Sequence, residues 1–185
     1  MTITVSDVFA SPHFVVEAVE KFGPNVLGFQ VATGEQRWYI VGVYIAPEDE
    51  ETMDRVVAAI GRKPRGAELM VVGNFNADIK ALEENRLAEN IATDIAAAGL
   101  EDMAQHFMLR RRRWNRDRRT WDMQRKGQVV RSWTDYIFGT DSRLFANVAV
   151  RDPGTTWTIT WSLVACRVYP CWRQSVTWGD ASGGR

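Results

Sequence analysis

The first apolar segments of the chain have the composition of β-strands. Residues 25–33 and 37–46 are rich in β-branched and aromatic side chains. The residues between them, 34–36, begin with glycine and suit a tight turn. This pattern predicts an antiparallel hairpin.

The next segments change to the spacing of helices. Residues 52–62 repeat apolar side chains at helical intervals, and Thr52 is the expected N-cap. A second helix is predicted over 85–98, because Gly99 follows as a stop. Between the two helices, the continuous apolar run 68–72 is typical of a strand buried on both faces.

Further strands are expected toward the end of the chain. Segments of suitable composition lie at 120–123, 129–138, 145–150 and 158–168, and the first two are joined by a turn at 126–128. This mixture of strands and helices predicts an α/β (α+β) fold. From residue 169 onward the periodicity is lost, and we expect a disordered tail over 169–185.

Charge is balanced overall but unevenly distributed. The 185 residues include 23 basic and 23 acidic side chains. Over residues 48–102 acids outnumber bases by 13 to 6, whereas residues 110–131 hold 10 bases and two acids. This asymmetry points to a polyanionic partner.

The two cysteines, Cys166 and Cys171, have no histidine near them in sequence, so a zinc site is not supported. We interpret them as reduced thiols. No membrane-spanning or secretion segment is recognisable either. We therefore expect an intracellular protein, nuclear or cytoplasmic, without a membrane partner.

Two polar positions stand out against apolar surroundings. The strand at 68–72 runs into Gly73, Asn74, Phe75 and Asn76, and polar groups at the end of such a strand lie where α/β folds bind ligands. An ordinary Asx turn is the alternative. Asp135 lies within an otherwise aromatic and apolar strand, so it either bonds to backbone amides or an arginine, or orients a group in an active site.

These two motifs resemble the endonuclease/exonuclease/phosphatase family, which carries Gly-Asp-x-Asn after a hydrophobic strand and Asp-Tyr-Ile after a Trp-containing hairpin. More widely, the sequence over residues 14–167 is similar to the endonuclease domain of fungal non-LTR retrotransposon polyproteins, which are associated with a reverse transcriptase. Matching segments include 22–25, 37–42, 44–47, 110–114, 120–121, 134–137 and 143–145.

The resemblance implies a DNase I-like fold, a four-layer β-sandwich flanked by helices, and a Mg²⁺-dependent cleavage of phosphodiesters. Asn76 corresponds to the phosphate-orienting asparagine and Tyr44 to the tyrosine after the preceding strand. Asp135 corresponds to the aspartate that positions the catalytic histidine. Together with Asn74, these residues are the candidate catalytic positions.

The departures from the family are at the reactive groups. Asn74 replaces the catalytic aspartate, and an amide neither accepts a proton at neutral pH nor gives a charged metal ligand. Thr160 and Trp161 stand where the family has an Asp-His pair. The only histidines, His13 and His106, lie elsewhere in sequence and are expected to have surface or packing roles. We assign no metal ligand and doubt that Mg²⁺ binds.

The resemblance also implies that the first half of the family's domain has no counterpart here. We expect an incomplete sandwich over 14–168, preceded by a disordered or edge segment over 1–13, with apolar surface left for a neighbouring chain or a missing half-domain.

A run of arginines is the strongest charge feature. Arginine suits phosphate, so this run is a candidate contact for the DNA backbone, although a solvated loop is the alternative. Its members are Arg110, Arg111, Arg112, Arg113, Arg116, Arg118 and Arg119.

Three functions follow from these features. The chain is an active phosphodiesterase, a catalytically dead remnant (a pseudoenzyme) that binds nucleic acid, or a decayed fragment without selected activity.

Overall fold

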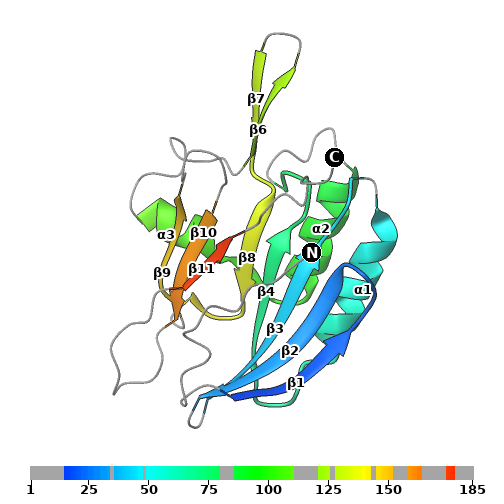
Figure 1. The fold of residues 1–185 in the computed structure, drawn as a ribbon, viewed down its shortest axis with the longest axis vertical. Helices are drawn as coiled ribbons and strands as arrows, with labels where there is room; N and C mark the ends of the chain where they lie inside the picture. Colours follow the sequence, from blue (N-terminus) through cyan, green and yellow to red (C-terminus); the bar gives the residue numbers. More distant parts are fainter. Residues whose placement is uncertain are drawn as a thin grey trace, which may run out of the picture.

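The computed structural model describes residues 15–33, 36–47, 49–79, 86–110, 121–125, 128–142, 145–151, 158–163 and 174–177. Its central feature is a six-stranded sheet with the order β1-β2-β3-β4-β8-β5 (Figure 1). The strands are β1 (Val15–Lys21), β2 (Val26–Thr33), β3 (Gln36–Tyr44), β4 (Glu68–Asn74), β5 (Glu101–Asp102) and β8 (Asp135–Gly139).

The predicted hairpin is confirmed, since β2 and β3 pair antiparallel from Val26 opposite Val43 to Thr33 opposite Gln36. β3 and β4 then run parallel, and β4 pairs antiparallel with β8. The predicted buried strand is also confirmed, because Leu69, Met70 and Val71 of β4 are almost fully buried.

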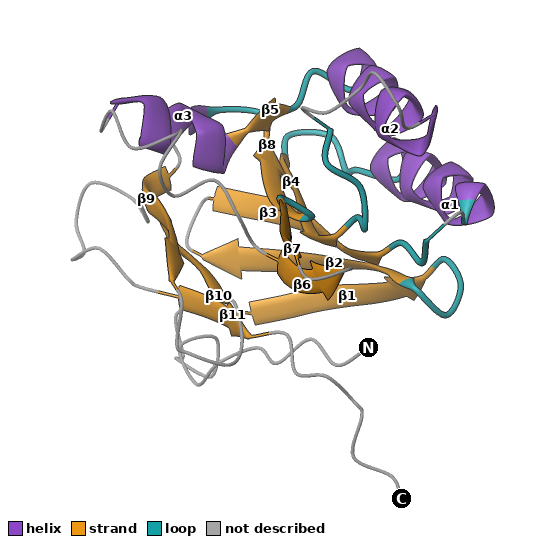
Figure 2. Cartoon of the chain, turned by 90° about the horizontal axis from the view of Figure 1, so that it is seen from above, coloured by secondary structure: helices purple, strands orange, loops and turns teal. Residues whose placement is uncertain are grey.

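Helices α1 (Glu50–Gly61) and α2 (Arg86–Ala97) cover one face of this sheet (Figure 2). The second sheet has the order β11-β10-β9 and lies on the other side (Figures 1 and 2). Its strands are β9 (Phe145–Arg151), β10 (Thr158–Leu163) and β11 (Gln174–Thr177), and helix α3 (Met103–Arg110) lies beside it. The arrangement is a sandwich with helices on one outer side, in agreement with the predicted α/β sandwich flanked by helices.

The remaining strands, β6 (Trp121–Arg125) and β7 (Gln128–Ser132), form a hairpin that projects from one end of the molecule (Figure 1). The prediction of one continuous strand over 129–138 was wrong. Its first part is β7 and its second part is β8, which belong to different sheets. The break at Trp133 and Thr134 has a physical cause: both residues bond to the loop after β4, which draws the chain out of the hairpin.

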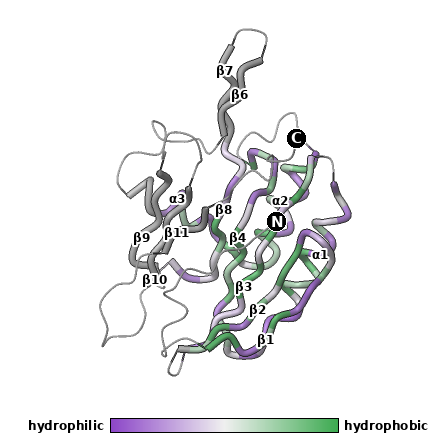
Figure 3. The backbone as a smooth tube through the Cα atoms, in the orientation of Figure 1, coloured by the Kyte–Doolittle hydropathy of each residue, from purple (hydrophilic) through white to green (hydrophobic). Residues whose placement is uncertain are grey.

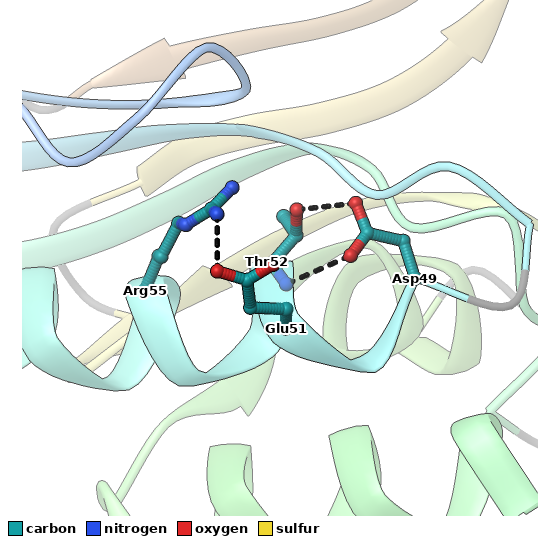
Figure 4. A network of polar contacts seen from close by, with 4 residues as sticks. All are labelled: Asp49, Glu51, Thr52 and Arg55. Carbon is teal, nitrogen blue, oxygen red and sulfur yellow. Dashed lines mark hydrogen bonds and ion pairs between the residues drawn. The ribbon is translucent and has the colours of Figure 1, made fainter.

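Helix α1 begins earlier than the sequence indicates, and its cap is Asp49 rather than Thr52. The Asp49 carboxylate accepts hydrogen bonds from the backbone N–H of Thr52 at 3.1 Å and from its hydroxyl at 2.6 Å (Figure 4). These bonds lower the pKa of Asp49 below its ordinary value, the one from the side chain of Thr52 contributing most. Glu51 and Arg55, four residues apart in the first two turns of the helix, form an ion pair.

Helix α2 matches its prediction closely. Leu87, Ala88, Ile91 and Ile95 form its buried stripe. Gly99 has a φ of +68°, a left-handed conformation that glycine adopts without strain, so the helix ends as expected.

Four elements were not predicted from the sequence: β1, β5, α3 and β11. No element was predicted over residues 15–21, which form β1, or over residues 101–110, which form β5 and α3. Within the expected disordered tail, Gln174–Thr177 form β11 and pair with β10, so the expectation is wrong for these four residues. Residues 1–14 and the other positions after 163 lie outside the described residues. None of the described helices is both long and apolar enough to span a membrane.

Candidate functional site

The candidate site lies at one end of the central strands. Tyr44, the last residue of β3, is opposite Asn74, the last residue of β4. Asn74 is in turn opposite Asp135, the first residue of β8. Directly opposed residues share a face of the sheet, so the three side chains lie on one face, the one turned away from α1 and α2. With strands about 4.8 Å apart, this row is roughly 10 Å long.

The turn after β4 depends on Gly73. A Cβ built at this position would lie 1.8 Å from the carbonyl oxygen of Val43 on the neighbouring strand. No side chain can therefore replace the glycine without moving the backbone. Gly73 lets the ends of β3 and β4 approach closely, and this fixes Asn74 beside Tyr44.

Beyond Asn74 the chain forms the Asx turn that the sequence offered as the alternative. The side-chain oxygen of Asn74 accepts a hydrogen bond from the backbone N–H of Asn76 at 2.8 Å. Asn76 has a φ of +48°, in the left-handed region that asparagine tolerates better than most residues. The turn therefore holds Asn76 in one defined position next to the row.

The side chain of Asn76 is tied back to β3. Its amide nitrogen donates to the carbonyl oxygen of Ile45 at 2.7 Å, while the N–H of Ile45 donates to the carbonyl oxygen of Asn74 at 2.9 Å. An amide nitrogen carries two protons, so the second remains able to donate to a ligand. Asn76 thus joins Tyr44, Asn74 and Asp135 at the same end of the sheet.

Asp135 is the most buried of the four residues, with 6% of its surface exposed. The hydroxyl of the neighbouring Thr134 donates to its carboxylate at 3.4 Å. Tyr44, by contrast, is 37% exposed, so the row runs from a buried acid to an accessible hydroxyl.

Hydrogen bonds join the segment before β8 to the loop after β4. The backbone N–H of Phe75 donates to the carbonyl oxygen of Thr134 at 2.7 Å. The N–H of Trp133 donates to the carboxylate of Asp78 at 3.4 Å. Asp78 had no assigned role at the sequence level, although it ends the polar run after β4.

Tyr136 makes the third connection between these two segments, and sequence reasoning had given its hydroxyl no role. The fully buried hydroxyl accepts from the N–H of Ile79 and donates to the carbonyl oxygen of Trp133, both at 2.9 Å. Its ring is stacked on Phe138 and meets Phe75 edge to face, on the side of the sheet turned toward the helices. The sequence signal that could have indicated this role is the position of Tyr136 within the Asp-Tyr-Ile motif.

Other predicted positions are not part of this arrangement. His106 lies on α3 and lines a cavity of about 390 Å³ between α2 and α3. Phe138 lines the same cavity and, three residues from Asp135, its side chain is on the opposite face of β8. The cavity and the candidate site therefore lie on opposite faces of the sheet. Thr160 and Trp161 are on β10, but their side chains lie outside the described residues, as does His13.

The arginine run is largely untested by the structure. Arg110 is the last residue of α3, and the other six arginines fall within the undescribed segment 111–120.

A magnesium ion would find a poor set of donors in this row. Mg²⁺ is held mainly by carboxylates, and Asn74 offers a neutral amide whose oxygen already accepts from Asn76. Among the described residues, no group of three or more His, Cys, Asp and Glu side chains could hold a metal ion. The residues of this row therefore do not fit a magnesium ion.

Comparisons with known proteins give a fold but no close relative. No family model and no curated protein matches the chain. A solved endonuclease/exonuclease/phosphatase family protein from Leptotrichia buccalis C-1013-b is 15% identical, with a TM-score of 0.54 over 76% of this chain and 56% of that one. This likeness confirms the predicted mixed α/β, DNase I-like fold.

Two further solved structures match less well. Truncated TDP2 of Caenorhabditis elegans is 14% identical, with a TM-score of 0.47 over 76% of this chain and 58% of that one. D. rerio TDP2 complexed with single strand DNA product is 17% identical, with a TM-score of 0.45 over 75% and 57%. The chain thus spans little more than half the length of each of these three structures.

Proposed function

We propose that the chain is a degenerate, truncated endonuclease/exonuclease/phosphatase domain, related to the DNA endonucleases of fungal non-LTR retrotransposons, which holds a phosphodiester but cleaves it weakly or not at all. The observation that carries the proposal is the convergence of Tyr44, Asn74, Asn76 and Asp135 at one end of the central sheet. The fold supports the family assignment at a coarse level.

The polar groups of this row suit binding better than cleavage. The hydroxyl of Tyr44 and the amide of Asn76 can donate hydrogen bonds to phosphate oxygens. Asn74 cannot serve as a base, because an amide has no basic lone pair at neutral pH. Asp135 is the one carboxylate of the row, and it lies at the buried end.

Cleavage can be tested on supercoiled plasmid DNA with Mg²⁺, and with EDTA as the blank. We expect the wild-type chain to nick the plasmid no faster than the Asn74→Ala variant does. A Mg²⁺-dependent rate well above that of Asn74→Ala would show that the domain is an active nuclease and that our assignment of weak or absent activity is wrong.

Binding is tested separately by the fluorescence anisotropy of a labelled single-stranded oligonucleotide. Asn76→Ala removes the donor amide and should weaken binding about tenfold, the value of one hydrogen bond to a charged group. Asn90→Ala is the matched control, because Asn90 lies on α2, on the helical side of the sheet. Equal affinities for the two variants would exclude the row as the phosphate site.

A second function is favoured by one observation, the seven arginines within residues 110–119. In this alternative the chain is a non-catalytic nucleic-acid-binding remnant whose DNA contact is the arginine segment. The affinity should then fall steeply with salt concentration. Replacing Arg111, Arg112 and Arg113 by Gln should make the plot of log affinity against log salt concentration less steep, by the amount expected for the loss of about three phosphate contacts. Under this alternative Asn76→Ala has no effect.

A further inference from the structure

The cavity between α2 and α3 lies on the helical side of the sheet and takes no part in the proposed function. Four almost fully buried side chains give it an apolar floor: Ile79, Ile95, Leu100 and Phe138. Hydrophobic and hydrophilic positions are mixed along α2, and Ile95 belongs to its buried stripe (Figure 3). A concave surface with an apolar floor and a few polar groups is the usual form of a small-molecule site.

The charged part of the lining is acidic and comes from β5. Asp102 is directly opposite Phe138 of β8, so its side chain lies on the same face of the sheet as that aromatic ring. The backbone N–H of Gln105 donates to one oxygen of the Asp102 carboxylate at 3.1 Å, which holds this carboxylate at the start of α3. Glu101 also lines the cavity, and the described residues of the lining include no lysine or arginine. The cavity therefore combines negative charge with an apolar floor.

These two features define the chemistry of an occupant. We propose that the cavity binds a small organic amine, whose apolar body lies on the floor and whose ammonium group lies beside Asp102 and Glu101. Two carboxylates attract a cation and repel an anion, and an ammonium N–H donates a charge-assisted hydrogen bond to a carboxylate oxygen. A metal ion is a poorer occupant, because no group of three or more described His, Cys, Asp and Glu side chains could hold one.

The volume of the cavity sets the size of the amine. An apolar cavity of about 150 Å³ already holds benzene. At about 390 Å³, the cavity between α2 and α3 has room for one ring and a short aminoalkyl chain. Phenethylamine has this composition and is the probe. The inference does not depend on the proposed function, because the cavity and the candidate site lie on opposite faces of the sheet.

Isothermal titration calorimetry of the full chain with three probes of similar shape tests the preference for a cation. The probes are phenethylamine, the neutral phenethyl alcohol and the anionic hydrocinnamate. Phenethylamine should bind about tenfold more tightly than phenethyl alcohol, the value of one hydrogen bond to a charged group, and hydrocinnamate should not bind. Equal affinities for the amine and the alcohol overturn the proposal, and so does an amine that fails to bind at millimolar concentrations.

Asp102→Asn tests the charge without removing the hydrogen bond to Gln105, because asparagine accepts at a helix start as well as aspartate does. It should lower the affinity for phenethylamine about tenfold and leave that for phenethyl alcohol unchanged. Asp94→Asn is the matched control, since it removes the same charge from α2 at a position that does not line the cavity. A loss of amine affinity in Asp94→Asn as large as in Asp102→Asn would contradict a specific contact.

A second pair of variants tests the place of binding. Ala96 and Ala97 are both exposed on α2, but only Ala96 lines the cavity. Ala96→Phe puts a ring into the cavity and should abolish the binding of phenethylamine and phenethyl alcohol alike. Ala97→Phe adds the same ring outside the cavity and should bind both as wild type does. If the two variants bind phenethylamine equally well, the amine is not held in this cavity and the proposal is wrong.

Discussion

The inner strands β4 and β8 of the six-stranded sheet and its outer strand β1 differ sharply in burial. All five residues of β8 are buried, and so are the five inner residues of β4, whereas six of the seven residues of β1 are exposed. The candidate site lies at the end of the buried strands, where hydrogen bonds fix the backbone on both sides. Polar groups that must hold a ligand precisely are best placed on such rigid elements, while an exposed edge is suited to partners.

The largest effect is expected where the buried strands approach most closely. Gly73→Ala places a Cβ on the carbonyl oxygen of Val43, so the ends of β3 and β4 must separate. We expect a loss of at least about 3 kcal/mol in the free energy of unfolding, measured by urea denaturation.

Gly61 gives the matched control for that substitution. It lies at the end of α1, and nothing would stand within 4 Å of its Cβ. Gly61→Ala should leave stability unchanged or raise it by up to about 1 kcal/mol. If both variants unfold at the same urea concentration as wild type, the close approach of β3 and β4 is wrong.

The comparison between centre and edge can be tested with a pair of identical substitutions. Val71 of β4 is fully buried, and Val19 of β1 is 59% exposed. Val71→Ala should lower the free energy of unfolding by about 2 to 3 kcal/mol, because it removes buried methyl groups and leaves a cavity. Val19→Ala should change it by less than about 0.5 kcal/mol.

Urea denaturation measures both variants. A Val19→Ala variant as unstable as Val71→Ala would mean that β1 is covered in the isolated chain. The contrast in burial between the inner strands and β1 would then be lost.

Removal of one hydroxyl tests how the two segments of the site are held together. Tyr136→Phe keeps the stacked ring but leaves the N–H of Ile79 and the carbonyl oxygen of Trp133 without their shared partner. Buried polar groups left unsatisfied cost about 1 to 3 kcal/mol, so we expect a loss of about 2 kcal/mol. Thermal unfolding monitored by circular dichroism is sufficient to measure it.

Tyr44→Phe is the control for Tyr136→Phe, because Tyr44 lies at the same end of the sheet with an exposed side chain. It should unfold like wild type. Faster hydrogen exchange at the amide of Ile79 in Tyr136→Phe alone would locate the damage in the loop after β4, and unchanged exchange there would contradict the bridging role.

The sequence predicted the local elements well and the long-range contacts poorly. The hairpin of β2 and β3, the buried strand β4 and the helix α2 follow from spacing and composition, which act within a few residues. The division of 129–138 could not be read in this way. It results from bonds between Trp133 and Asp78, and between Thr134 and Phe75, which are far apart in sequence.

The same distinction holds for the candidate site. The resemblance singled out Tyr44, Asn74, Asn76 and Asp135, and the strand registers bring them together; their roles stay a prediction. The hydroxyl of Tyr136 and the carboxylate of Asp78 act through backbone groups of another segment. Such contacts have no signature in spacing or composition, so the sequence alone gave them no role.

The smallest effect concerns the cap of α1, at the periphery of the sheet. Asp49→Ala removes two hydrogen bonds to Thr52 and should cost about 1 kcal/mol at neutral pH. The pKa of Asp49 is lowered in the folded chain, so its contribution is complete above the ordinary value of 3.8 and is lost as the pH falls through the lowered pKa. The stability difference between wild type and Asp49→Ala should therefore be constant near neutral pH and shrink only in acid.

Asp49→Asn separates the hydrogen bonds from the charge. Asparagine is as good an N-cap as aspartate but does not titrate, so this variant should be nearly as stable as wild type at neutral pH and should not lose its cap in acid. Stability curves from pH 2 to 7 on the three proteins measure both effects. A stability difference between wild type and Asp49→Ala that grows in acid would contradict the direction of the pKa shift. Equal stability of all three proteins at neutral pH would contradict Asp49 as the N-cap and favour Thr52 instead.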